Sequence, residues 1–457
     1  MRTLALLSPV LLLLLCGFSV KSRRPQAPAI ETPVIVTAAP VFEPQAALAR
    51  VDGERFPQGA HLLLVSGGKA EALAPDFAAS ADANVSFDGK SVLFAGRKNT
   101  GETWKVWEMK LADRSVRLVA SGEADLVRPH YLPSGRLVYA RRGVHGFGLE
   151  AASLDGSETL ALTHIQAAAL PVDVLQDGRV LFEAGFPLGS WGKPELYLVY
   201  SDGSGVESVR CDHGAIGAGR WGGHQLASGD VVFTHGRTLA RFTSPLAVET
   251  PVTAPAVEYA GPIAEAASGD WLASTRRGGG RFALTLVKAG SAVLRPYYAD
   301  AANHLVEPTL VAPRATPKRH PTALHDWTTA NLLALDVRIS REGVLAQAPP
   351  LVRVEEQDAD GRVVTVGTSP VEADGSFYVK VSGDKPVRFA LMDAAGRVVR
   401  AERGWFWIRA GEQRICVGCH AGPERAPENR VPQVLLRTTL PVDLTKQADG
   451  KGSAGSR

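Results

Sequence analysis

Residues Asn84–Phe94, with the sequence Asn-Val-Ser-Phe-Asp-Gly-Lys-Ser-Val-Leu-Phe, form one copy of a hairpin that recurs along the chain and indicates the fold class. In each copy an Asp-Gly or Ser-Gly turn, whose glycine accepts positive φ, precedes a run of β-branched or aromatic residues. Successive turn glycines are 46, 43, 51 and 40 residues apart, close to one four-stranded propeller blade. The copies are Asn84–Phe94, His130–Tyr139, Asp173–Phe182, His224–Phe233 and Ala264–Ala273.

Five copies predict five blades, and the neighbouring apolar runs predict at least one more. Leu62–Val65 and Phe282–Val287 read as further strands, one of which closes the ring and so removes an exposed sheet edge. We therefore expect a mainly β protein with a propeller of six, or alternatively seven, blades over residues 60–312. The Asp-Gly hairpins resemble the blades of TolB-like propellers.

Composition supports a multidomain globular protein and excludes some partners. The chain has 457 residues, 45% of them hydrophobic, which is too long for one core and too apolar for disorder. The 50 Lys and Arg residues against 47 Asp and Glu leave a formal charge of +3. This balance argues against a nucleic-acid surface and against a polybasic membrane patch.

The N-terminus predicts export, to the periplasm of a bacterium or otherwise out of the cytoplasm. Residues 1–20 have the charged start and Leu-rich run of a signal peptide, and 21–59 are expected to form a linker. Lys21, Arg23 and Arg24 leave an uncleaved anchor as an alternative. Lipidation at Cys16 is a second alternative, although Leu15 occupies a position that normally holds a small residue.

A second domain is expected after the Pro-rich linker Pro313–Pro321. Residues 313–409 contain short strands separated by turn signals, which predicts a small β-sandwich, and residues 445–457 are polar enough to be a disordered tail. The expected strands are Leu332–Ile339, Leu351–Glu355, Val363–Val366, Ser376–Val381, Val387–Leu391 and Val398–Val399.

The segment 410–444 carries the motif Cys416-Val417-Gly418-Cys419-His420. Two thiols with an adjacent imidazole are the attachment motif of a c-type haem, with thioethers from Cys416 and Cys419 and His420 as axial iron ligand. A zinc knuckle would need a second ligand pair, and a redox dithiol would need a strand-to-helix setting. We therefore predict one covalent haem c.

The surroundings of the haem offer several candidate contacts. Trp405 and Trp407 alternate onto one face of a strand, where they form either sandwich core or a wall against the haem edge. Met392, His320 and His325 are candidates for the sixth iron position, and water or an empty site is the alternative. Six-coordinate iron would pass electrons, whereas five-coordinate iron can bind a small ligand.

The order of these parts resembles the propeller and middle domain of the hydrazine synthase alpha subunit. The resemblance is most specific in Asp374–Val381, Gly404–Arg409, the haem motif and Ala426–Pro432, and it implies a haem c held beside the propeller, with Arg430 near the cofactor. The family pattern also implies a tyrosine ligand soon after the motif histidine, but Ala421–Glu424 contains none. The resemblance therefore implies the haem for this protein, but it does not imply hydrazine synthesis.

Equivalent positions of the five hairpins suggest a second site near the propeller axis. Five residues before each turn glycine lie Asn84, His130, Asp173, His224 and Ala264. Imidazole and carboxylate suit zinc or another divalent metal, and His235 on the same face with Cys211 nearby could complete the ligand set. The alternatives are a site for a small molecule and an ordinary wet channel.

Two functions from different classes follow. The first is an exported mono-haem protein that transfers electrons to a redox partner protein docked on or near the propeller. The second is a haem enzyme acting on a small nitrogen or oxygen species between propeller and haem. A binding scaffold with a structural haem is a third reading.

Overall fold

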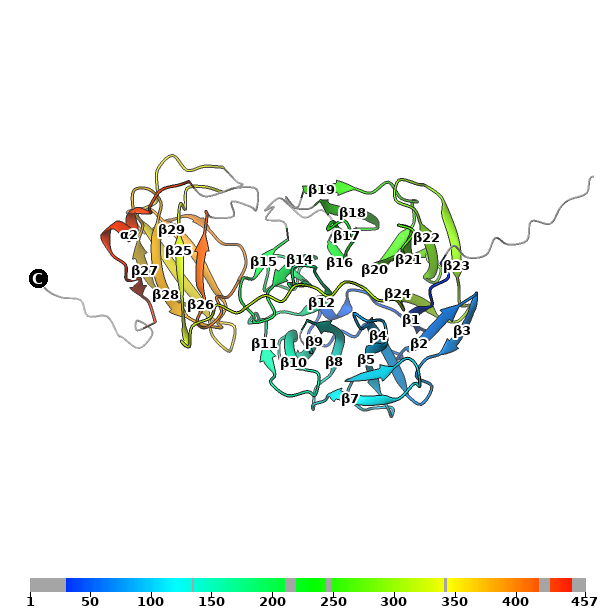
Figure 1. Cartoon of the computed structure of the whole chain (residues 1–457). Coiled ribbons are helices and arrows are strands. Elements are labelled where there is room, and N and C mark those ends of the chain that lie inside the picture. Colours follow the sequence, from blue (N-terminus) through cyan, green and yellow to red (C-terminus); the bar gives the residue numbers. More distant parts are fainter. Residues whose placement is uncertain are drawn as a thin grey trace, which may run out of the picture.

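The computed structural model describes residues 30–133, 135–209, 219–243, 248–340, 343–418 and 428–445. It is almost entirely β, as the sequence predicted, with a propeller from the N-terminal part and a two-sheet sandwich from the C-terminal part (Figure 1). The two helices of the described residues are short: α1 (Ala46–Ala49) and α2 (Gln433–Arg437). Within the same ranges, no helix has the length and apolar character of a membrane span.

The described chain forms six four-stranded propeller blades. The first five follow the predicted hairpins, and each turn glycine from Gly89 to Gly269 has positive φ. Blade one contains β4 (Ala79–Val85), β5 (Ser91–Arg97), β6 (Lys105–Lys110) and β7 (Val116–Ala120). Blade two contains β8 (Leu126–Leu132), β9 (Arg136–Gly143), β10 (Gly146–Ser153) and β11 (Leu160–Ala161). Blade three contains β12 (Ala169–Val174), β13 (Val180–Gly185), β14 (Pro194–Val199) and β15 (Glu207–Ser208). Blade four contains β16 (Arg220–Gln225), β17 (Val231–His235), β18 (Thr238–Thr243) and β19 (Val248–Pro251). Blade five contains β20 (Glu258–Glu265), β21 (Trp271–Arg276), β22 (Ala283–Val287) and β23 (Leu294–Tyr298).

The sixth blade closes the ring with strands from both ends of the propeller. Its order is β24 (His304–Leu310), β1 (Val34–Ala39), β2 (His61–Ser66) and β3 (Lys69–Ala72). β1 is fully buried and pairs with β24, for example Thr37 with Val306. The expected linker 21–59 thus includes a propeller strand. Its partner lies some 270 residues away and no turn flanks it, so local sequence signals cannot reveal the pairing.

The sandwich contains the predicted strands in two sheets. One sheet has the order β27 (Val363–Pro370), β26 (Leu351–Gln357), β29 (Val387–Met392) and β30 (Val398–Ala401). The other has the order β31 (Gln413–Cys416), β25 (Thr329–Ala334), β28 (Phe377–Ser382) and β32 (Val442–Asp443). β31 and β32 pair in parallel with their neighbours, so the haem segment adds both edge strands to this sheet.

The junction between propeller and sandwich is tightly packed. Trp407 is fully buried among side chains of blades two and three, and its Nε1 donates to the carbonyl of Gly203 at 2.9 Å. Ile408, which alternates with the tryptophans, packs in the sandwich core, and Phe406 contacts both the sandwich core and the propeller cluster. The expected Trp face therefore belongs to the propeller contact rather than to the sandwich core.

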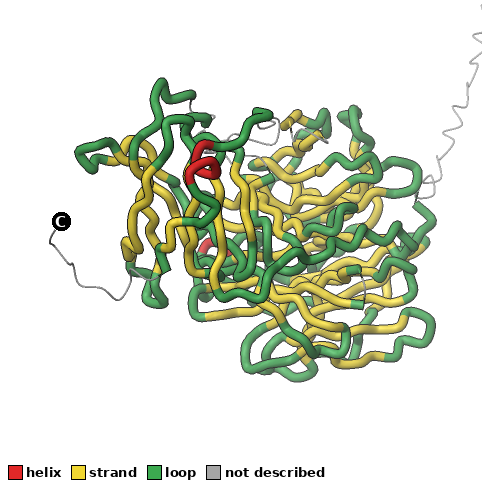
Figure 2. Tube along the Cα trace, turned by 60° about the vertical axis from the view of Figure 1, so that its left-hand side comes forward, coloured by secondary structure: helices red, strands yellow, loops and turns green. Residues whose placement is uncertain are grey.

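The linker between the two parts lies along one face of the propeller (Figure 1), and Figure 2 shows that both parts consist of strands joined by loops. Its backbone is tied to two blades, because the N–H of Arg314 donates to the Phe87 carbonyl at 2.8 Å and that of Lys318 to the Gln176 carbonyl at 2.9 Å. The His320 ring stacks on Tyr200 with 3.7 Å between centroids. We call residues 312–320 the strap.

Candidate functional site

The inner strands of the propeller share an irregularity that shapes the channel. The register of the first two strands shifts in each of blades one to five, for example between Ala81 and Asn84. Five residues have positive φ, four of them at these shifts and the fifth in β24, and three of the five are not glycine. A β-bulge bends the strand and redirects its side chains toward the axis. The five are Asp82, Arg128, Gly222, Gly261 and Glu307.

A chamber of about 640 Å³ lies at one end of the channel, beneath the strap. The strap contributes lining residues from Ala312 to Pro317. The five ring positions chosen from the hairpin repeat all line this chamber, and four of them are polar: Asn84, His130, Asp173, His224 and Ala264. The repeat therefore locates one end of the channel.

His224 and Asp173 form a pair within the chamber. The Nδ1 of His224 lies 3.1 Å from Oδ2 of Asp173, which also accepts the N–H of Gln225 at 2.9 Å. Burial opposes ionisation of Asp173, but His224 and the backbone donors outweigh it and lower its pKa to about 2. Asp173 is therefore a carboxylate whose charge is already matched by hydrogen-bond donors.

The ligand set expected for a second metal is not assembled. Both ring nitrogens of His130 face backbone carbonyls, those of Arg128 at 3.0 Å and Val172 at 3.1 Å, and burial lowers its pKa. His235 lies outside the chamber, with Nδ1 2.7 Å from Oε1 of Glu249. Cys211 lies outside the described residues, and the described ones hold no group of three His, Cys, Asp or Glu suited to a metal. The register shift in blade four places His224 opposite Val232 and His235 opposite Arg220, so these two histidines do not meet as regular strand pairing had predicted.

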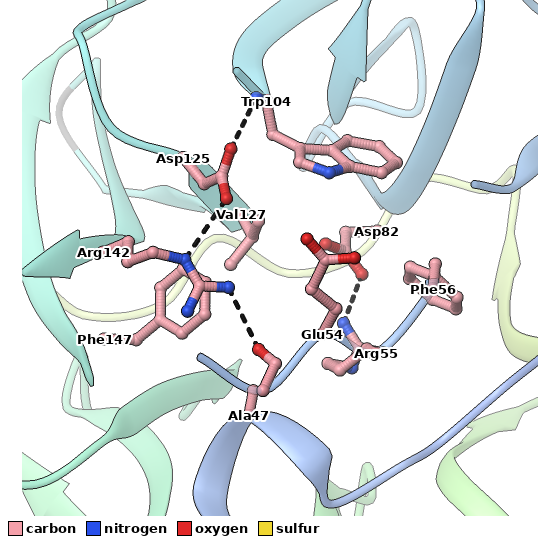
Figure 3. A pocket seen from close by; sticks show the side chains of 11 residues that line it. Ala47, Glu54, Arg55, Phe56, Asp82, Trp104, Asp125, Val127, Arg142 and Phe147 are labelled. Carbon is pink, nitrogen blue, oxygen red and sulfur yellow. Dashed lines mark hydrogen bonds and ion pairs between the residues drawn. The ribbon is translucent and has the colours of Figure 1, made fainter. Parts of the chain in front are cut away.

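The opposite end of the channel is closed by the segment 40–59, which we call the plug. Phe42 and Phe56 of the plug pack against each other and against Trp104 and neighbouring apolar side chains. Figure 3 shows Arg55 reaching from the plug to Asp82, with Nη1 2.6 Å from Oδ1. A small cavity of about 30 Å³ lies beside Arg55 and Asp82 at this end, and another of about 310 Å³ lies between Leu48 of the plug and Trp191.

Between plug and chamber lies a cluster of five buried charges, which we call the waist. Arg55 pairs with Asp82 and Glu307, while Arg128 pairs with Glu183 and Glu307. Desolvation resists the charge on Glu307, but the two guanidinium groups hold its pKa far below its usual range. Buried charges are tolerated when each has close partners, and each charge of the waist has at least one, although the Nε of Arg55 is buried without a hydrogen-bond partner among the described residues.

The haem motif begins where β31 ends. Cys416 lies opposite Ala334 of β25 and packs partly against the sandwich core. A Cβ on Gly418 would approach the Ile339 carbonyl oxygen at 3.0 Å and that of Asp336 at 3.1 Å, so glycine is required by the close approach. Cys419 and His420 lie outside the described residues.

Arg430 anchors the chain where the described residues resume after the motif. Its Nη1 donates to Oδ2 of Asp374 at 2.5 Å and its Nε to Oε2 of Glu428 at 2.9 Å. It also lies 3.9 Å from Asp336, whose carbonyl contacts the Gly418 position. Arg430 is therefore beside the start of the motif, although its charge is paired with Asp374.

Trp405, like Trp407, faces the propeller. Its Cβ and ring lie against Gly189, its N–H donates to the Leu188 carbonyl at 2.8 Å, and Arg388 lies 4.5 Å over its ring. Both tryptophans therefore fix the position of the sandwich on the propeller, which is the role that their contacts assign.

The three candidates for the sixth iron position are engaged elsewhere. Met392 points away from the sandwich core, since Leu391 beside it faces that core, and its Sδ lies 3.9 Å from Arg353. His325 stacks on Trp327 at 4.2 Å and contacts Gln413. His320 is held on Tyr200.

Sequence reasoning missed the charged residues of the strap and the waist. Arg314 stood in a Pro-rich linker and Arg55 in an expected linker, where a cation is normally solvated. The only signal available was the bulge sequence itself, since Arg128-Pro129 and Glu307-Pro308 place a charge before proline inside an apolar strand.

Comparison with known proteins supports both halves of the architecture. Residues 347–421 match the family model "Hydrazine synthase alpha subunit middle domain". Hydrazine synthase of Kuenenia stuttgartiensis superposes with a TM-score of 0.75 and 16% identity over 89% of this chain and 72% of that one. TolB of Acinetobacter baumannii gives a TM-score of 0.46 and 14% identity over 64% and 68%. No curated protein matches significantly. The chain thus shares its fold with hydrazine synthase, and its residues 347–421 match the model of the alpha-subunit middle domain, as the sequence resemblance predicted.

Proposed function

We propose that this chain is an exported bacterial c-type haem protein that transfers electrons to a protein partner. One haem c would be attached through Cys416 and Cys419, with His420 as axial ligand, and would supply a site that gains and loses one electron. The attachment motif supports the cofactor, and the hydrazine synthase-like fold supports a haem-related redox role.

The surroundings of Cys416 fit thioether attachment better than dithiol chemistry. Burial raises the pKa of the Cys416 thiol, although Arg414 opposes this. A redox-active dithiol needs a lowered thiol pKa, because the thiolate is the reactive form. The described residues also offer no second ligand pair for a structural zinc. A haem thioether requires neither.

The main support for the proposal is that both the sandwich and the propeller fix the position of β31. β31 pairs with β25 of the sandwich on one side. Arg414 lies within β31 and donates through Nη2 to the Val206 carbonyl. Glu412 lies just before β31 and accepts the Gly205 N–H at 3.3 Å, so both residues contact blade three. Cys416 therefore begins the motif at a fixed junction, and a haem attached there would keep a constant position relative to the propeller.

Covalent attachment is tested by expressing the full chain in a host that exports protein and matures c-type haem. We expect a band with haem peroxidase activity on a denaturing gel and a c-type reduced absorption spectrum. Cys416→Ser with Cys419→Ser should remove the stain, while Cys211→Ser should keep it. Unstained wild-type protein would overturn the proposal.

A second candidate is a haem enzyme that binds a small nitrogen or oxygen species at the junction. It is favoured by the placement of Met392, His320 and His325, each of which contacts other groups in the described structure. An open sixth position would follow. Carbon monoxide added to the reduced protein distinguishes the two, because a shifted spectrum supports the enzyme and an unchanged one supports electron transfer.

A further inference from the structure

Two charged side chains of the chamber wall, Arg314 and Glu265, lack among the described residues the oppositely charged partners that the other charged groups of the wall have. Asp173 is matched by His224, and Glu307 is matched by Arg55 and Arg128. Arg314 of the strap and Glu265 at the end of β20 also line the chamber. Within the described ranges, neither has an oppositely charged side chain within 4.0 Å.

Arg314 presents a guanidinium to the chamber from the strap. Its Nη2 reaches the Val85 carbonyl at 3.4 Å, and its guanidinium carbon lies 4.3 Å over the Phe87 ring. The residue as a whole is exposed, but loss of water around the guanidinium lowers its pKa, with Asp173 opposing this effect. These contacts leave most of its five N–H donors for another acceptor.

Glu265 presents a carboxylate from blade five. Its Oε2 accepts the N–H of Ala227 at 2.7 Å, which fixes the side chain and leaves Oε1 without a described partner. A half-buried carboxylate held by one backbone donor can accept further bonds from an ammonium group. The wall therefore carries one spare cation and one spare anion on separate elements.

We propose that the chamber binds a small zwitterion of the amino-acid type. The carboxylate of the ligand would meet the planar fork of Arg314, which matches two oxygens at once, and its ammonium would meet Glu265. The side-chain amide nitrogen of Asn84 remains as a further donor, since only its Oδ1 is used, by the Tyr131 N–H at 3.0 Å. About 640 Å³ is ample for such a molecule.

A dipolar ligand explains the wall better than a simple ion does. A lone anion at Arg314 would leave Glu265 unmatched and would share the chamber with the Asp173 carboxylate. A lone cation at Glu265 would leave the guanidinium unmatched. Only a molecule with both charges satisfies both groups without changing the net charge of the chamber.

The test is calorimetric titration of the full chain with glycine, β-alanine and γ-aminobutyrate, which space the two charges differently. Acetate and methylammonium serve as single-charge probes. We expect one zwitterion to bind at one per chain, and Arg314→Gln and Glu265→Gln each to weaken it about tenfold or more. Arg237→Gln and Glu71→Gln, both exposed outside the chamber, should leave binding unchanged. Thermal melts verify that each variant folds.

Several results would overturn the proposal. One is that no zwitterion binds the wild-type protein. Another is that acetate or methylammonium alone binds as tightly as the best zwitterion, which would indicate a simple ion site. Unchanged binding in a folded Arg314→Gln or Glu265→Gln variant would place the ligand elsewhere. Haem content does not enter these measurements, so they stand apart from the electron-transfer proposal.

Discussion

The two ends of the propeller channel are built from the same inner strands but are covered differently. At one end the plug inserts Phe42 and Phe56 and delivers Arg55 into the waist. At the other end the strap crosses the wall without filling it and leaves a chamber of about 640 Å³. The plug end is therefore part of the core, whereas the strap end keeps polar side chains beside open space.

The charged residues near the plug therefore contribute to stability, whereas those near the strap are placed to bind a ligand. Charges of the waist face partners inside the protein, so removing one leaves another buried and unpaired. Arg314 and Glu265 of the chamber wall retain spare hydrogen-bonding capacity, so they are available to a ligand. Substitutions near the plug should therefore lower the free energy of unfolding strongly, and substitutions near the strap should lower it only slightly.

Arg128→Ala should have the largest effect on stability. It leaves Glu183 and Glu307, both buried, with fewer cationic partners, and we expect a loss of about 4 kcal/mol in the free energy of unfolding. Urea denaturation followed by circular dichroism measures it. Arg237→Ala, whose side chain is 80% exposed, is the control. A loss no greater than that of the control would contradict the description of the waist.

Phe56→Ala should cost about 3 kcal/mol, because it opens a void among the aromatic side chains of the plug. Val293→Ala, with 64% of the residue exposed on blade five, should change the unfolding midpoint very little. The same denaturation experiment compares them. If both variants lose equal stability, the plug does not belong to the core.

Asp173→Asn tests the chamber by its pH dependence. The folded-state pKa of Asp173 is lowered from 3.8 to about 2, so its carboxylate stabilises the fold by about 2 kcal/mol above about pH 4, and this is lost as pH falls through about 2. The stability difference between wild type and variant should therefore shrink across this interval. Denaturation midpoints at a series of pH values measure it, and a constant difference would contradict the His224 pairing.

His320→Ala should have the smallest effect. Loss of the stack on Tyr200 is worth about 1 kcal/mol and acts on the strap rather than on the whole fold. Hydrogen exchange at the Arg314 and Lys318 amides should accelerate, while the exchange of β24 stays unchanged. Equal acceleration in both segments would show that the strap and the closing blade unfold together.

Local signals in the sequence predicted the hairpins of the propeller and the strands of the sandwich. They could not predict pairing between strands that lie far apart in the sequence. The turn glycines place five hairpins because a two-residue turn brings its strands together locally. β1 has no such signal, and its partner β24 follows the rest of the propeller. The chamber wall was located from the repeat, but its ligand groups were not. The bulges change which side chains meet, and Arg314 arrives from a segment whose composition indicates only a linker.

The closure of the ring by β1 and β24 sets an order of events during synthesis. Val34–Ala39 leaves the ribosome early, yet its neighbour His304–Leu310 follows only after all five intervening blades. Until then one face of the nascent propeller exposes an apolar edge that can pair with another chain. The strap comes directly after β24, and Cys416 comes about a hundred residues later. A matured haem segment would therefore be added to a ring that has already closed.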